Sequence, residues 1–220
     1  MITSKPTHYG AGIILYGDYW DLKSLHDLIH RLSVGLPLGD SALSDFVLAL
    51  AYDIRHAYQG DRLEDTFGYD ELDTVKYRGV KILWPIIIPQ IALLRWAAGF
   101  HPTSRLDQSE LFILEHCIEE SLREYDPNIG PLVFELRTMF EGMRSGYYTQ
   151  FFWEMARQYV LEGKAGKARF KRLPEILGKL SSFSTDYKEF SVFLEKTAKE
   201  KNASPHELDF FDFDDPDFKW

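Results

Sequence analysis

The sequence lacks most of the features that point to a known function. It contains a single cysteine, Cys117, so no disulfide can form within the chain. Cys117 falls within an apolar helical pattern, and we expect a buried, inert thiol. We find no nucleophile elbow, dinucleotide fingerprint, zinc-knuckle spacing or EF-hand loop. These absences exclude a small disulfide-stapled domain and leave the chain without a recognisable catalytic signature.

Long uninterrupted apolar runs are also missing. The most apolar segment, residues 82–100, is interrupted by Pro85, Pro89, Gln90 and Arg95, which favours a core element over a membrane span. The first twelve residues, MITSKPTHYGAG, lack the apolar stretch of a signal peptide. We therefore expect a cytoplasmic protein that has no membrane partner.

Positive charge is scarce. The chain carries 25 Lys and Arg against 34 Asp and Glu, a net charge of −9. Residues 205–220 hold six carboxylates and one lysine, a net −5, so the rest of the chain carries only −4. Nucleic-acid binding generally needs a clustered cationic surface. We therefore expect no nucleic-acid partner.

What the sequence does contain is enough apolar material for a large core. Of its 220 residues, 45% are hydrophobic and 15% aromatic, which is typical of a folded domain. We predict one globular domain over residues 1–203, followed by an acidic and aromatic docking tail at residues 204–220.

Hydrophobic periodicity predicts an α+β fold that is predominantly α-helical, with about eight helices and a small two- or three-stranded antiparallel sheet. Strands are expected at Gly12–Tyr16 and Thr74–Trp84, with a polar loop at Gly60–Leu72. Asp21 is the expected N-cap of the first helix. Further helices are expected at Ser41–Tyr58, from Pro85 or Pro89 to about Gly99, at Gln108–Tyr125, from Gly130 to about Met143, at Tyr147–Leu161, from Pro174 and at Thr185–Lys201, and a short tail helix with a capping box at Ser204 and Glu207.

Two segments carry a resemblance to a known family. The opening GIILYGDYWDLKSLHDLIHRL and the later YRGVKILWPIIIPQIALLRWAAG resemble an uncharacterised bacterial domain family of unknown function, over about the first half of the chain. The resemblance implies a bacterial cytoplasmic protein. It implies no activity and assigns no role to any residue.

The tail, PHELDFFDFDDPDFKW, is the most informative stretch of the chain. Disordered tails are poor in aromatic residues, because large apolar side chains gain nothing in water. We therefore predict that Phe210, Phe211, Phe213, Phe218 and Trp220 dock onto the chain's own body or onto a partner.

A basic stretch at residues 163–172, GKAGKARFKR, is the complementary feature. Its cations, among them Lys167, Arg169 and Arg172, are a predicted contact for the acidic tail. Each buried ring contributes about 1.5–3 kcal/mol, whereas each exposed ion pair contributes at most about 1 kcal/mol, so the rings would supply the affinity and the charges the register. A solvated basic turn and a small-anion or nucleotide site are the alternatives.

A second alternative concerns His26 and His30. At a spacing of i and i+4 the two lie on one side of a helix and could hold zinc or another divalent metal, with Asp18 as a further candidate ligand, in a metal-dependent hydrolase. Histidines at the edge of an apolar stripe are the other interpretation, and Asp18 also suits a turn or a helix cap. The leading interpretation includes no cofactor.

Arg95 lies inside the most apolar segment and needs a partner. We expect a carboxylate of the next helix, Glu115 or Glu119, to pair with it; an anion pocket is the alternative.

Taken together, the residues favour a non-enzymatic protein-interaction module that binds a protein partner or a second copy of itself through its tail. The metal-dependent hydrolase and the anion binder remain open as alternatives.

Overall fold

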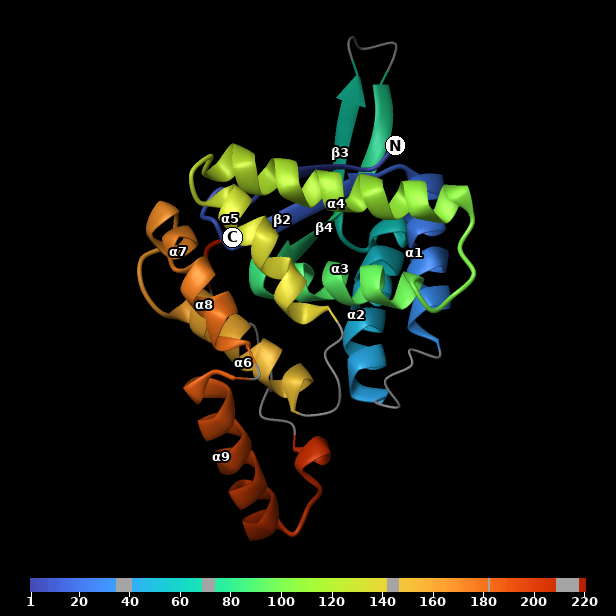
Figure 1. The fold of residues 1–220 in the computed structure, drawn as a ribbon. Coiled ribbons are helices and arrows are strands. Elements are labelled where there is room, and N and C mark those ends of the chain that lie inside the picture. Colours follow the sequence, from blue (N-terminus) through green and yellow to red (C-terminus); the bar gives the residue numbers. More distant parts are fainter. Residues whose placement is uncertain (35–40, 69–73, 142–146, 182, 209–217) are drawn as a thin grey trace.

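The computed structural model describes residues 1–34, 41–68, 74–141, 147–181, 183–208 and 218–220 (Figure 1). Four strands form one antiparallel sheet in the order β1-β2-β4-β3. The strands are β1 (Thr3–Pro6), β2 (Gly12–Gly17), β3 (Leu63–Gly68) and β4 (Thr74–Leu83).

Helices make up most of the described chain. Its described residues contain nine α-helices and two short 3₁₀-helices. They are α1 (Tyr19–Ser33), α2 (Ser41–Gln59), α3 (Trp84–Ala98), α4 (Arg105–Tyr125), α5 (Gly130–Glu135), η1 (Leu136–Phe140), α6 (Tyr148–Leu161), α7 (Lys167–Lys171), α8 (Leu173–Lys179), α9 (Thr185–Lys201) and η2 (Pro205–Glu207). The predicted α+β class with predominant helix is thus confirmed, although the sheet has four strands where two or three were expected.

Alternation along the central strands places one row of side chains in the core. Ile13 and Leu15 of β2 lie opposite Ile82 and Val80 of β4, and all four are buried. On the other face the ring of Tyr16 covers Gly79 so closely that a Cβ there would lie 2.5 Å from the ring. Glycine at this position therefore lets the aromatic ring lie flat on the sheet.

Helix α3 passes through the centre of the molecule. Thirteen of its fifteen residues are buried. Pro85 occupies the first turn, where its missing N–H costs nothing, and the helix continues through Pro89. Among the described helices, none is both long and apolar enough to cross a bilayer.

Several predicted boundaries were wrong. Asp18, not Asp21, is the N-cap of α1; Asp21 occupies the third helical position and completes a capping box. The expected polar loop at residues 60–72 contains β3, because pairing with β4 satisfies its backbone despite two carboxylates. The helix expected from Gly130 to about Met143 is split into α5 and η1.

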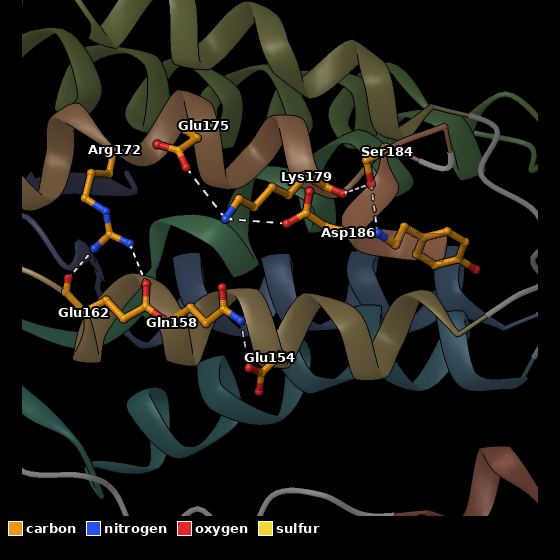
Figure 2. A network of polar contacts seen from close by, with 9 residues as sticks. Glu154, Gln158, Glu162, Arg172, Glu175, Lys179, Ser184 and Asp186 are labelled. Atoms are coloured by element: carbon orange, nitrogen blue, oxygen red, sulfur yellow. Dashed lines mark hydrogen bonds and ion pairs between the residues drawn. The ribbon is translucent and has the colours of Figure 1, made fainter. Parts of the chain in front are cut away.

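Helix α9 projects away from the body (Figure 1). It has its own small cluster of three buried residues, Leu194, Ala198 and Leu208. Figure 2 shows the polar network at its base, where Lys179 of α8 pairs with both Glu175 and Asp186. Surface pairs of this kind contribute little each, so we expect α9 to be less firmly held than the main core.

Candidate interaction site at the C-terminal residues

The last three described residues lie against the main body. Phe218 and Trp220 are both half-buried, pack against the main core, and have ring centroids 4.9 Å apart. Three residues from separate segments contact them, Tyr9 after β1, Lys81 of β4 and Arg169 of α7. We call this set of three residues the tail dock.

Two hydrogen bonds fix the backbone of the docked residues. The Tyr9 amide donates to the main-chain oxygen of Trp220 at 2.9 Å, and Arg169 Nη1 donates to the Lys219 carbonyl at 2.6 Å. Neither bond depends on the side chain that the docked residue carries. The backbone of any extended segment could accept them, so sequence preference must come from the rings.

Cations lie over the rings at the dock. Lys81 Nζ is 5.4 Å from the centroid of Trp220, and the Arg169 guanidinium carbon is 6.0 Å from that of Phe218. Both distances lie within the range in which a cation is attracted by a ring face. The dock therefore prefers aromatic side chains at the two outer positions.

Arg169 is the central residue of the dock. It is only 3% exposed, and its hydrogen bonds go to the carbonyls of Tyr9 (3.3 Å), Val160 (3.1 Å) and Lys219 (2.6 Å). Within the described part of the chain, no carboxylate lies at ion-pair distance from it. Burial lowers the pKa of this guanidinium, and its Nε has no described partner. Among the described residues, its charge is thus balanced by carbonyl dipoles and by the ring of Phe218.

Hydrogen bonds hold the loop before β2 in place. The Gly166 amide donates to the Tyr9 carbonyl at 2.8 Å, and the Tyr159 hydroxyl donates to the Gly10 carbonyl at 2.6 Å. Gly10 has φ of +69°, and a Cβ there would lie 2.6 Å from the hydroxyl of Tyr125. The loop, α6 and α7 therefore form a rigid seat for the tail.

A cavity of about 530 Å³ adjoins the dock. Its polar groups are Asp53, Arg62 and Lys81, and Asp53 Oδ1 accepts from Arg62 Nη2 at 3.2 Å. Burial raises the pKa of Asp53, although Arg62 and His56 oppose that shift. The remaining lining residues are apolar or aromatic: Leu63, Val80, Ile82, Leu83, Ile86, Trp153, Phe218 and Trp220.

The structure brings together three of the predicted interaction residues, Arg169, Phe218 and Trp220. Lys167 instead lies over the ring of Tyr125, at 5.8 Å. Arg172 pairs with Glu162 at 3.0 Å (Figure 2). Phe210, Phe211 and Phe213 lie outside the described residues.

The basic stretch at residues 163–172 is not an open loop, because residues 167–171 form α7. Its best-placed donors, the Gly166 amide and Arg169, already bond protein carbonyls. Arg169 meets the described part of the tail through the Lys219 carbonyl. Five of the six tail carboxylates lie at residues 209–217, outside the described residues, so the predicted charge contact with the basic stretch stays a prediction.

The predicted metal ligands are placed as follows. His26 and His30 lie on α1 with ring centroids 6.1 Å apart, and His26 Nδ1 is 2.9 Å from Asp27 Oδ1. Asp18 accepts the Asp21 amide as the helix cap. Across the described segments, no group of three or more His, Cys, Asp or Glu is arranged to hold a metal ion. No observation here favours the hydrolase.

Sequence reasoning missed Tyr9, Lys81 and the cavity. Tyr9 contributes its backbone and a ring over which Lys219 Nζ lies at 5.4 Å. An isolated tyrosine in a short loop gives no sequence signal for either contact. Lys81 had a weak one, because it stands between buried residues in a predicted strand.

Comparison with known families gives one match. A family model described as a domain of unknown function, DUF6904, matches residues 2–220. The resemblance first noticed in the amino-terminal half therefore extends over nearly the whole chain. No curated protein and no solved structure matches this sequence.

Proposed function

The chain belongs to the DUF6904 family of unknown function, and from its own geometry we propose that it is a protein-interaction module. In this proposal the tail dock binds residues 218–220 with the rings of Phe218 and Trp220, either those of its own chain or those of a second copy. Exchange of the tail between two copies would produce a homodimer.

The observation that carries this proposal is the mode of contact at the dock. Two hydrogen bonds to main-chain oxygens and three cation–ring contacts hold the docked residues; the third contact is Lys219 Nζ over the ring of Tyr9, at 5.4 Å. All of these contacts are indifferent to which chain supplies the segment. A terminal element that docks within one chain can dock equally well between two, since the interface formed is the same.

The expected strength of docking fits reversible exchange. Full burial of an aromatic side chain contributes about 1.5–3 kcal/mol, and Phe218 and Trp220 are only half-buried. Two hydrogen bonds add about 1 kcal/mol each before the ordering cost is subtracted. The docked state is thus favoured by a few kcal/mol at most, which leaves the undocked state accessible.

A labelled peptide of residues 205–220 tests the proposal directly. The host is the full-length Phe218→Ala/Trp220→Ala variant, whose own tail no longer carries the two rings. We expect the wild-type peptide to bind this host, and a peptide with the same two alanine changes to bind at least about tenfold more weakly, a difference of 1.4 kcal/mol. Fluorescence anisotropy measures both affinities.

Light scattering of the unaltered full-length chain over a range of concentrations reports exchange. We expect a dimer to appear as the concentration rises, and the Phe218→Ala/Trp220→Ala variant to stay monomeric. Equal affinity for the two peptides, together with a monomer at every concentration, would contradict the proposal.

A further inference from the structure

The cavity beside the dock has the size and lining of a small-molecule site. Its volume of about 530 Å³ falls in the range of known ligand pockets. Eight of its eleven lining residues are apolar or aromatic. Rings from two distant parts of the chain, Trp153 of α6 and Trp220, both line it, so a flat apolar body would find aromatic surface in the cavity.

Among the described residues that line the cavity, Asp53, Arg62 and Lys81 sum to one net positive charge. Arg62 and Asp53 pair with each other at 3.2 Å. Lys81 has no carboxylate at ion-pair distance within the described residues, and its ammonium is directed to the Trp220 ring. One positive charge next to a mostly apolar cavity favours an anion over a neutral or cationic ligand.

Asp53 restricts where an anionic group can lie. Its carboxylate occupies Arg62 at 3.2 Å, and burial raises its pKa because the surroundings disfavour a negative charge there. A second anion beside Asp53 would meet a like charge and the same desolvation. The anionic group of a ligand therefore belongs on the Lys81 side of the cavity.

We propose that this cavity binds a small monoanion with an aromatic body, which places its anionic group against Lys81 and its rings against Trp153, Phe218 and Trp220. The ligand class is an aromatic carboxylate, sulfonate or similar acid. This inference is independent of tail exchange, because the two C-terminal rings line the cavity whichever copy supplies them.

Binding would be linked to docking of the tail. Phe218 and Trp220 form part of the cavity wall only when they are docked. A ligand that contacts them therefore binds the docked state more tightly and stabilises it. The fraction of molecules with a docked tail would therefore increase with the concentration of a small anion that binds the cavity.

The test uses two dyes of nearly the same shape on the full-length chain. 1-Anilinonaphthalene-8-sulfonate is an aromatic anion, and N-phenyl-1-naphthylamine is its neutral counterpart. We expect the anionic dye to bind with 1:1 stoichiometry and to quench tryptophan emission. We expect Lys81→Met to weaken the anionic dye about tenfold and to leave the neutral dye unchanged.

Lys5→Met is the matched control. Lys5 occupies the same cross-strand row as Lys81, with Ile14 between them, and its ammonium also lies over a ring, that of Phe67 at 4.6 Å. It lies outside the cavity, so its loss should affect neither dye. Phe218→Ala/Trp220→Ala should weaken both dyes, because it removes part of the wall.

Three results would overturn the inference. One is no binding of the anionic dye to the unaltered chain. Another is equal loss of affinity in Lys81→Met and Lys5→Met, which would indicate general attraction to positive charge. The third is loss of binding in Phe193→Ser, since Phe193 lies on the exposed face of α9. The dye results and the peptide results are read separately, so either proposal can fail alone.

Discussion

Two arginines far apart in the molecule are held in opposite ways. Arg95 of α3 forms a two-pronged contact with Glu115 of α4, at 2.7 and 2.8 Å, and donates a third bond to Gln108. Arg169 of α7 is more deeply buried, and its hydrogen bonds within the described residues all go to carbonyl oxygens. One cation is neutralised by a carboxylate, and the other is surrounded by dipoles.

The difference separates a contact that persists throughout the folded state, Arg95 with Glu115, from one that depends on docking of the tail, Arg169 with Lys219. Arg95 and Glu115 lie on two long helices, so their contact exists whenever the core is folded. Arg169 donates its shortest hydrogen bond, 2.6 Å, to the Lys219 carbonyl. Undocking of the tail would therefore remove one of its three acceptors. Arg169 thereby couples the stability of the body to the position of the tail.

Replacement of Arg169 by methionine should have the largest effect. The carbonyls of Val160 and Lys219 would lose the Arg169 donor, whereas the Tyr9 carbonyl would keep its bond from the Gly166 amide. Each buried carbonyl left without a donor costs about 1–3 kcal/mol before relaxation. We expect the free energy of unfolding to fall by about 3 kcal/mol, measured by urea titration followed by circular dichroism.

The variant Arg169→Lys separates the contribution of the charge from that of the hydrogen bonds. Lysine keeps the charge but cannot bond three carbonyls at once with a planar fork. It should recover only part of the lost stability. A methionine variant as stable as the unaltered chain would show that the buried charge costs as much as its hydrogen bonds contribute.

Removal of the Trp220 ring should have a smaller effect. Trp220→Ala deletes a half-buried ring, and we expect a loss of about 1–2 kcal/mol in the free energy of unfolding. The Tyr9 amide, which bonds the main-chain oxygen of Trp220, should also exchange its hydrogen faster. Hydrogen exchange read by mass spectrometry measures this.

The control for that experiment is Phe193→Ala. Phe193 is 54% exposed on α9 and, among the described residues, is not one of those that pack against the main core. It should leave exchange at Tyr9 unchanged. Equally faster hydrogen exchange at the Tyr9 amide in both variants would mean that loss of any ring loosens the loop. The effect of Trp220 would then not be specific to the dock.

The two arginines also mark the limit of prediction from sequence. A cation inside an apolar helix demands a carboxylate, and the next helix offered Glu115 and Glu119 one turn apart, so the pair with Glu115 was predictable. The carbonyls around Arg169 belong to Tyr9, Val160 and Lys219, and a backbone oxygen carries no signature in the sequence. The sequence indicated that the aromatic rings of the tail would dock, but it did not indicate which residues would contact them.

The same reasoning explains the secondary structure. The helix Thr185–Lys201 was predicted at both ends, because Ser184 caps it and local periodicity defines it. Strands β1 and β3 were not predicted, since TSKP and LEDTFG are short and polar. What makes them strands is pairing with β2 and β4, which is a tertiary effect.

A double-mutant cycle on Arg95 and Glu115 tests the ion pair that does not depend on the tail. Both side chains are partly buried, with 26% and 16% exposed, and their geometry is bidentate. We expect a coupling energy of about 1 kcal/mol from Arg95→Met, Glu115→Gln and the double variant. Hydrogen exchange at Tyr9 should not change in any of the three. Faster exchange there would show that the two arginines belong to one network, and the comparison would fail.

The pair of Asp53 and Arg62 at the cavity should show the smallest effect, with an opposite sign. Burial raises the pKa of Asp53 in the folded state above its ordinary value of 3.8. The folded state therefore binds the proton more tightly, and ionisation of Asp53 lowers stability as the pH rises from about 3.8 through the raised pKa. Asp53→Asn removes this cost at neutral pH. Because the side chain is 37% exposed, the gain should stay below about 1 kcal/mol.

The pH dependence identifies the cause of that gain. Urea titrations at pH values below and above this window should give a difference between the asparagine variant and the unaltered chain only above it. Such a result would group Asp53 with Arg169, as a charged residue whose burial lowers the stability of the fold. A variant less stable than the unaltered chain at neutral pH would place it with Arg95 instead, because the ion pair with Arg62 would then outweigh the cost of burying the Asp53 carboxylate.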